Sequence, residues 1–168
     1  MTDLASWVLA QIADDEAAAR AATPGPWRYN PAKHWRKPDS TWFEEAVFAG
    51  PVGDDAICIA GTGETDDTGS AADAVHIARH DPARVLAECA AKRAIVELHK
   101  PRLNGFVMGR PGESREQMHN RWNSRTEMVC PTCMDGVKRA TAPCLTLRLL
   151  AQPYADRPGW GPAWRVDA

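Results

Sequence analysis

The sequence lacks an apolar stretch approaching the roughly 18 to 20 residues that a membrane-spanning helix needs. We also expect no secretory signal, because Asp3 precedes the first apolar residues and an acidic run at 14–16 follows them. Cysteine is scarce, with five residues, an odd number, spread through 168. This disfavours a disulfide framework of the secreted type. We therefore expect a cytoplasmic protein in a reducing compartment, with no membrane contact.

The net charge of -2 hides an asymmetry along the chain. Residues 1–91 contain 7 Lys or Arg against 15 Asp or Glu, whereas residues 92–168 contain 13 against 7. The first part is therefore net -8 and the second net +6. A length of 168 residues predicts a single domain that is large enough to bury a core.

Three cysteines in the last third of the chain have the spacing of metal ligands. Cys130 and Cys133 form a Cys-x2-Cys pair, and Cys144 follows in a segment expected to open a helix. Thiolates two residues apart can both reach one tetrahedral ion at about 2.3 Å. His99, at the end of a long predicted helix, is the fourth ligand that we predict. The cofactor is then structural Zn2+, because four protein ligands leave no open position for water or substrate.

Two alternatives to a zinc site stay open. A single Cys-x2-Cys pair without a second pair is also compatible with ordinary buried or reactive cysteines. A redox pair is the other alternative, but such motifs open a helix after a strand. Here Met134, Asp135 and Gly136 predict a turn instead.

The periodicity of apolar residues predicts a helix followed by a small antiparallel sheet. Asp3 caps the helix, whose apolar residues recur at helical spacing as far as about Ala22. Three strand-like segments come next, at residues 27–29, 42–48 and 56–60. The last segment is uniformly apolar, so we expect both of its faces to be covered.

Two consecutive helices are predicted next, after a polar linker over residues 61–69. Ser70 and Asp73 indicate a capping box for a helix over residues 71–80. A second helix begins at Pro82 and continues to about His99.

The rest of the chain completes an α+β fold. Residues 101–128 have the poorest apolar pattern and predict an irregular loop or insertion. A short helix over about 143–152 and an irregular tail come after it, within a zinc-braced C-terminal lobe at residues 129–168. Together with a helix, sheet and helix body in residues 1–100, these parts predict one domain.

Three motifs carry a resemblance to a known family. They are Ala-Thr-Pro-Gly-Pro-Trp-Arg at 22–28, His-Ile-Ala-Arg-His-Asp-Pro-Ala-Arg-Val-Leu-Ala-Glu at 76–88, and Pro-Cys-Leu-Thr-Leu-Arg at 143–148, with Pro-Tyr-Ala soon after the last. The chain resembles a family of small proteins of unknown function from high-GC Gram-positive bacteria and their phages. Its Thr-Pro-Gly-Pro-Trp, short sheet and Ile-Ala helix also resemble the Ead-like accessory proteins of temperate phages.

The resemblance implies a mobile-element accessory protein, in the host cell cytoplasm if it is phage-encoded. No catalytic activity is established for the family that it resembles. Members often carry a His near the end of the long helix and cysteines before the Pro-Cys-x-Thr-Leu-Arg segment. The matching residues here are His99, Cys130, Cys133 and Cys144.

Two segments interleave basic and aromatic residues, at 33–37 and 115–125. Cations can meet phosphates while an indole stacks on an exposed base, so these segments suit nucleic acid. Aromatic and Arg-rich surfaces also suit protein partners, and the net acidity argues against general DNA coating. We favour a protein partner, with nucleic acid as the alternative. The candidate binding residues are Trp35, Arg36, Arg115, Arg121, Trp122, Arg125, Trp160 and Trp164.

Enzyme-like signals are weak in this sequence. His76 and His80 have the spacing that zinc proteases use, but Ile77 occupies the position that the general-base Glu would need. His119 near the Cys-x2-Cys pair resembles a zinc-braced nuclease, without its second Cys pair and second catalytic His. We predict a non-enzymatic accessory protein, with a hydrolase or nuclease as second alternative.

Overall fold

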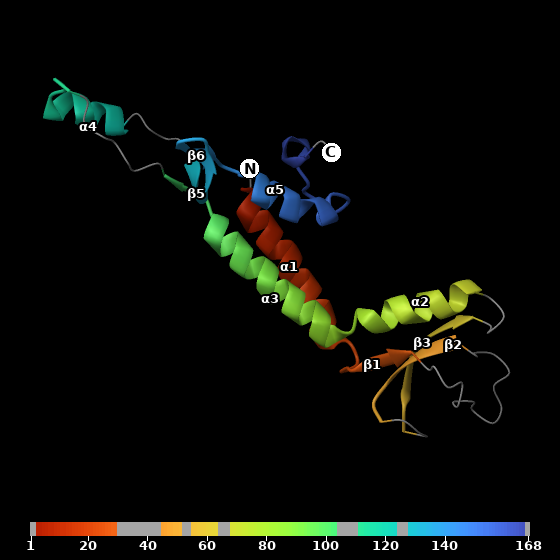
Figure 1. Cartoon of the computed structure of the whole chain (residues 1–168). Coiled ribbons are helices and arrows are strands. Elements are labelled where there is room, and N and C mark those ends of the chain that lie inside the picture. The colour runs from red at the N-terminus through yellow and green to blue at the C-terminus, as the bar shows by residue number, and fades with distance from the viewer. Residues whose placement is uncertain are drawn as a thin grey trace. The chain divides into compact units, whose positions relative to one another are not determined.

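A computed structural model describes residues 3–29, 45–51, 55–63, 68–103, 111–123 and 128–166 (Figure 1). The chain divides into two compact units. Residues 1–12 and 92–168 form one of them, the terminal unit, and residues 13–91 form the other, the central unit. The fold is α+β with small antiparallel sheets, as predicted. The predicted single domain itself stays a prediction.

Helix α1 (Leu4–Ala21) begins where its cap predicts. Asp3 accepts hydrogen bonds from the Ser6 hydroxyl at 2.7 Å and from the Ser6 backbone N–H at 3.1 Å. The bond from the hydroxyl contributes most to holding the pKa of Asp3 below its ordinary value, and the backbone N–H acts in the same direction. The charged carboxylate thus satisfies the first turn of the helix.

The central unit is an antiparallel sheet with helix α2 (Thr68–Arg79) packed against all three strands. The strands are adjacent in the order β1 (Trp27–Tyr29), β2 (Glu45–Ala49) and β3 (Ile57–Gly63). Small side chains fill the buried layer, because the helix lies close to the strands. They are Ala46, Val47, Ala49 and Ala74.

Two predictions about the third strand and the linker after it are wrong. The sequence predicts that other residues cover both faces of this strand, but Ile57 is 53% exposed. An antiparallel sheet can leave one face in water. The predicted linker over 61–69 is also wrong at both ends, because β3 continues to Gly63 and α2 begins at Thr68. Residues 64–67 between them, like residues 42–44 of the predicted second strand, lie outside the described part of the chain.

The prediction of a capping box at Ser70 is wrong as well. Ser70 lies inside α2 and is buried, and its backbone carbonyl accepts a hydrogen bond from the Thr62 hydroxyl at 2.7 Å. This contact holds the first turn of α2 against β3, and the helix begins three residues, nearly one turn, before the predicted start at residue 71.

Helix α3 (Pro82–His99) confirms the predicted second helix. Its first turn is capped by Asp81, which accepts a hydrogen bond from the Arg84 N–H at 2.8 Å. Cys89 and Val96 are buried along it. The helix ends at His99 because Pro101 cannot continue it.

A second antiparallel sheet lies in the terminal unit, in the order β4 (Arg102–Leu103), β5 (Met128–Asp135) and β6 (Lys138–Thr141). The turn between β5 and β6 contains Gly136 at φ 62°, a left-handed conformation that favours glycine. Met134 and Asp135 belong to β5, so the turn predicted over 134–136 starts too early.

The irregular loop predicted over residues 101–128 is wrong where the structure describes it. Besides β4, the segment contains helix α4 (Arg115–Asn123). The Ser114 hydroxyl accepts the Gln117 N–H at 3.2 Å, and the Gln117 side chain accepts the Ser114 N–H at 2.9 Å. The sequence contains this Ser-x-x-Gln capping box, which indicates the start of a helix. The prediction of a loop relies on the poor apolar pattern alone.

The C-terminal helix is shorter than predicted and is followed by single turns. Its elements are α5 (Leu145–Ala151), η1 (Gln152–Tyr154) and η2 (Pro162–Trp164).

An aromatic cluster joins the two sequence-distant parts of the terminal unit. The Trp7 ring lies 6.5 Å from Tyr154, 5.6 Å from Trp160 and 5.3 Å from Trp164, measured between centroids. The Trp7 indole N–H donates to the Pro158 carbonyl at 3.1 Å. Such a cluster buries large aromatic area in specific edge and tilted contacts, so the C-terminal tail is anchored through side chains.

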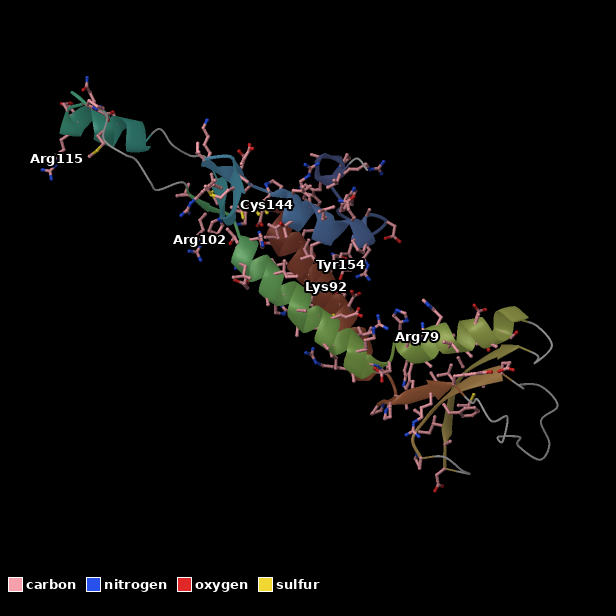
Figure 2. All side chains as sticks on the ribbon, viewed as in Figure 1. Arg79, Lys92, Arg102, Arg115, Cys144 and Tyr154 are labelled. Carbon is pink, nitrogen blue, oxygen red and sulfur yellow. The ribbon has the colours of Figure 1, made fainter. Side chains whose placement is uncertain are left out.

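Tyr154 is also held by cations. The Lys92 ammonium lies 3.1 Å from its hydroxyl, and the Arg157 guanidinium lies 4.8 Å from the centroid of its ring (Figure 2). The Lys92 contact joins η1 to the second half of α3, and the Arg157 contact joins it to the chain that follows η1.

Candidate metal centre

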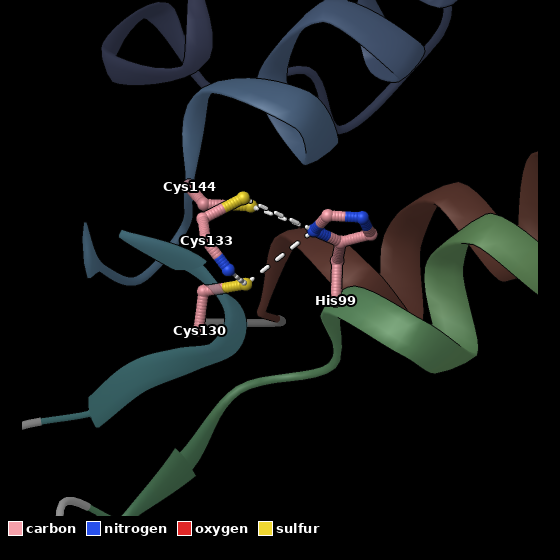
Figure 3. Close-up of side chains that lie close together, drawn as sticks. All are labelled: His99, Cys130, Cys133 and Cys144. Atoms are coloured by element: carbon pink, nitrogen blue, oxygen red, sulfur yellow. Dashed lines mark hydrogen bonds between the residues drawn. The ribbon is translucent and has the colours of Figure 1, made fainter. Parts of the chain in front are cut away.

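Three chain segments of the terminal unit bring the four predicted metal ligands together (Figure 3). His99 ends α3, Cys130 and Cys133 lie in β5, and Cys144 directly precedes α5. The ligand atoms of these four residues all lie within 4.8 Å of one another. The cluster could therefore hold a metal ion.

The separations within the cluster fit a tetrahedral ion. The Nδ1 atom of His99 lies 3.4 Å from the sulfur of Cys130, 3.3 Å from that of Cys133 and 3.6 Å from that of Cys144. A tetrahedral zinc with bonds of about 2.3 Å to sulfur and about 2.0 to 2.1 Å to nitrogen requires nitrogen to sulfur separations of about 3.5 Å. One nitrogen facing three sulfurs at this separation is the arrangement that a Cys3His site needs.

Backbone and hydroxyl groups around the sulfurs position them. The Cys133 N–H donates to the Cys130 sulfur at 3.3 Å, which closes the turn between these two ligands. The Thr132 hydroxyl donates to the Leu98 carbonyl, which ties β5 to the end of α3 beside His99. The Thr146 hydroxyl lies 3.5 Å from the Cys133 sulfur. Such outer contacts orient the ligands of a metal.

Thr132 and Thr146 were not predicted from the sequence. In the sequence, Thr132 lies between two of the ligands and Thr146 lies two residues after the last ligand. Nothing in the spacing says which carbonyl or sulfur such a hydroxyl reaches.

The pKa values of two of the thiols shift in opposite directions. Burial raises the pKa of Cys130, but the N–H groups of Cys133 and Thr132 favour its thiolate, and the net pKa is lowered. Burial raises the pKa of Cys144 to about 11, and the nearby Cys130 charge adds to this. A cation at the centre of the cluster would favour all the thiolates, since thiolates are the forms that bind a metal.

The surroundings of the Cys-x2-Cys pair differ from those of a redox motif. Both cysteines lie in strand β5, which continues into the hairpin with β6 rather than opening a helix. Cys144 lies one residue before α5, slightly earlier than the predicted first helical turn.

The predicted partner-binding residues come from several segments of the chain. Arg115 is exposed at the start of α4 (Figure 2). Trp160 and Trp164 are half-buried in the aromatic cluster, 5.8 Å apart between centroids. Arg121 and Trp122 lie in α4, but their side chains are outside the described part, as are Trp35, Arg36 and Arg125 entirely. Their binding roles stay predictions.

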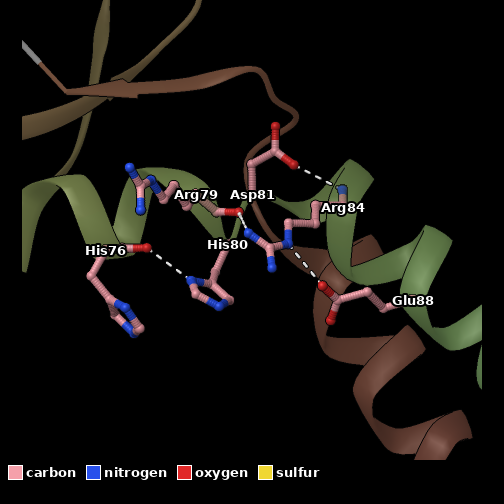
Figure 4. A network of polar contacts seen from close by, with 6 residues as sticks. All are labelled: His76, Arg79, His80, Asp81, Arg84 and Glu88. Atoms are coloured by element: carbon pink, nitrogen blue, oxygen red, sulfur yellow. Dashed lines mark hydrogen bonds and ion pairs between the residues drawn. The ribbon is translucent and has the colours of Figure 1, made fainter.

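His76 in α2 and His80, which directly follows this helix, are both exposed, and their rings are tilted by 44° with centroids 4.5 Å apart (Figure 4). Nδ1 of His80 lies 2.8 Å from the His76 carbonyl, and Arg84 forms an ion pair with Glu88 at 2.7 Å nearby. Within the described ranges, the cluster around His99 is the one group of three or more His, Cys, Asp or Glu ligand atoms. The histidine pair is a contact on the surface.

The three sequence motifs are spread over most of the chain, and a family match also covers most of it. The chain belongs to a family of unknown function. The family model, described as "Family of unknown function (DUF6221)", matches residues 1–166. Comparison with curated proteins gives no match, and comparison with solved structures gives none either. Membership in DUF6221 confirms that the chain belongs to a family of unknown function. The motifs, the bacterial and phage source, and the likeness to phage accessory proteins stay predictions.

In the described part of this DUF6221 chain, no helix combines the length and apolar character that crossing a bilayer requires.

Proposed function

We propose that this DUF6221 chain is a non-enzymatic, zinc-stabilised protein that binds a protein partner. The observation that carries the proposal is the set of three nitrogen to sulfur separations of 3.3 to 3.6 Å in the His99 cluster. Thiolate and imidazole ligands in a tetrahedral arrangement favour zinc. Four protein ligands also favour a structural ion over a catalytic one, because no position stays open for a substrate.

The role proposed for zinc is to hold three segments in place. The end of α3, the β5–β6 hairpin and the start of α5 would share one ion through His99, Cys130, Cys133 and Cys144. A site of this kind is not formed in the unfolded chain, so its binding free energy becomes folding free energy.

Exposed apolar side chains beside the ligands support a binding role. Leu98 precedes His99, Met134 follows Cys133 and Leu145 follows Cys144, and all three are more than half exposed. Val137, at the tip of the hairpin, is 94% exposed. Apolar surface that a metal holds rigid suits a protein partner, because little side-chain freedom is lost on association.

Nucleic acid is the second candidate, favoured by charge. Residues 92–168 carry a net +6 and residues 1–12 add one Asp, so the terminal unit is net +5. Arg102, Lys138 and Arg139 are exposed on its sheet. Phosphate groups would be attracted to such a surface.

The proposal places the protein in the cytoplasm, as a phage or mobile-element accessory protein of a bacterial host. Sequence resemblance supports the origin. All five cysteines lie among the described residues and none forms a disulfide there, which supports a reducing compartment.

Affinity capture from the native host cell, read by mass spectrometry with and without nuclease, tests the binding function. We expect the tagged chain and a Cys58→Ser control to recover the same protein in both conditions. Cys58 is exposed and lies in β3 of the central unit, outside the cluster, whereas Cys130→Ser should lose the partner. Recovery that disappears with nuclease would favour the nucleic-acid function, and equal recovery by Cys130→Ser would separate partner binding from the metal.

A further inference from the structure

A hollow of about 480 Å³ opens on the terminal unit, and none of its lining belongs to the metal ligands themselves. Its walls are mainly apolar, and they come from the start of α1, the loop after α3, the start of β5, the loop before α5 and η2. The main lining residues are Leu4, Lys100, Pro101, Met128, Pro143 and Trp164.

Each segment that supplies a metal ligand also supplies part of this hollow. Lys100 and Pro101 follow His99 directly, and Pro143 precedes Cys144 directly. Met128 lies two residues before Cys130 in the same strand. An ion bound by the four ligands would therefore fix the spacing of these three segments of the lining. Loss of the ion would let them move relative to one another.

The lining residues and their direct sequence neighbours include three basic residues. Lys100 lines it, and exposed Arg102 and Arg165 directly follow the lining residues Pro101 and Trp164. Lys100 also lies 3.3 Å from Glu97, but both side chains are about half exposed, and such a surface pair holds its partners weakly.

The carboxylate of Asp3 also lines the hollow, but it is engaged by the Ser6 hydroxyl and N–H. Its charge therefore satisfies the first turn of α1. The net +5 of the terminal unit leaves an acidic ligand as the complementary one.

We propose that this hollow binds a short peptide segment of a partner protein, which inserts an apolar side chain and carries acidic residues beside it, and that binding requires the metal-loaded cluster. The volume lies in the range of roughly 300 to 1,000 Å³ that ligand pockets occupy, which suits one or two large side chains. This inference rests on the proposed function and names the chemistry of the partner.

Selection from a display library of random short peptides without Cys or His tests the proposal, because such peptides cannot bind through zinc. The target is the full chain, loaded with zinc and checked for zinc content by elemental analysis. We expect enrichment of peptides that combine Phe, Leu, Ile or Trp with Asp or Glu. The affinity of the most enriched peptide is then measured by fluorescence anisotropy.

Two variants and two matched controls locate the site. Met128→Ser and Lys100→Glu should each weaken binding about tenfold, through lost apolar burial and reversed charge. Leu149→Ser is the control for the first, because Leu149 is 52% exposed and lies outside the hollow. Arg20→Glu is the control for the second, because it reverses the charge of an exposed cation that pairs with Glu16 at 3.4 Å, outside the terminal unit. Both controls should bind like the wild type, and Met128→Leu should restore binding. Zinc content and circular dichroism verify that each variant is folded.

Several results would overturn the proposal. They are selection of basic or wholly polar peptides, equal losses in the variants and their controls, or binding that survives removal of zinc by a chelator. Failure of the selection with fully zinc-loaded protein would also overturn it, while partner capture from the host cell would still support the proposed function. Oligothymidine that binds in place of peptides, and is lost in Lys100→Glu, would assign this surface to nucleic acid instead.

Discussion

The two units differ in charge and in the size of the side chains that they bury. The central unit holds 7 basic and 14 acidic residues, for a net -7, whereas the terminal unit is net +5. The central unit buries mostly alanine and valine in its sheet, as at Ala46 and Val47. The terminal unit buries larger side chains, among them Trp7, Leu147 and Tyr154.

This difference indicates which part of the terminal unit a metal would stabilise. Leu147 and Tyr154 are buried in the C-terminal third, so side-chain packing also holds this part of the chain. The cluster lies where the β5–β6 hairpin meets two helix ends. Exposed residues dominate this hairpin beyond Cys133, so its own apolar contacts are few. A metal would fix the hairpin, while side-chain packing holds the helices.

Removal of the metal should have the largest effect and should act on one unit. Structural zinc sites contribute apparent binding free energies on the order of 10 kcal/mol. We expect chelation, or Cys133→Ser, to abolish hydrogen-exchange protection in β5 and β6 and to leave β2 and β3 protected. Exchange measured by mass spectrometry checks this, and equal loss of protection in both sheets would show that the metal stabilises the two units alike.

The next largest effects are expected from substitutions that shorten a buried side chain in each unit. Leu147 and Val47 have no exposed surface. Leu147→Ala should cost about 3 kcal/mol and Val47→Ala about 2 kcal/mol of unfolding free energy, in proportion to the apolar volume removed. Denaturant titration gives these values. Only Leu147→Ala should weaken zinc binding, and a loss of zinc affinity in Val47→Ala would show that the two units are coupled.

The cap of α1 should have a smaller effect with a defined pH dependence. Asp3→Ala removes both hydrogen bonds to Ser6 and should cost about 1 kcal/mol. The pKa of Asp3 in the folded state lies below its ordinary value of 3.8, so the stabilisation is present above that pH and is lost as pH falls through the folded pKa. Thermal unfolding of wild type and variant should therefore converge in strong acid, and a difference that persists there would point to a cause other than charge.

The smallest expected effect belongs to α4. Ser114→Ala removes one half of the capping box and should cost about 1 kcal/mol or less, confined to this helix. Exchange of the amides in residues 115–123 should accelerate without any change in zinc content. A change in zinc content would mean that α4 supports the metal centre.

Local features of the fold could be predicted and non-local ones could not. The caps at Asp3 and Asp81 and the ligand set of the cluster follow from side-chain chemistry at short spacing, and the structure brings each set together. The contact between Thr62 and Ser70 joins β3 to α2, and the pairing of Arg102 with Val129 in the sheet joins residues far apart in the chain. The packing of Trp7 against Trp160 and Trp164 is equally distant, so no periodicity in the sequence predicts it.

The metal content of the purified chain decides whether the His99 cluster is a zinc site. Elemental analysis of protein prepared without chelator should find close to one zinc per chain in the wild type and in Cys58→Ser, and none in Cys130→Ser. His99→Ala should lower the zinc content and its affinity, because one of the four ligands is lost. A wild-type chain without zinc, or zinc retained in full by Cys130→Ser, would contradict the assignment of the cluster to zinc.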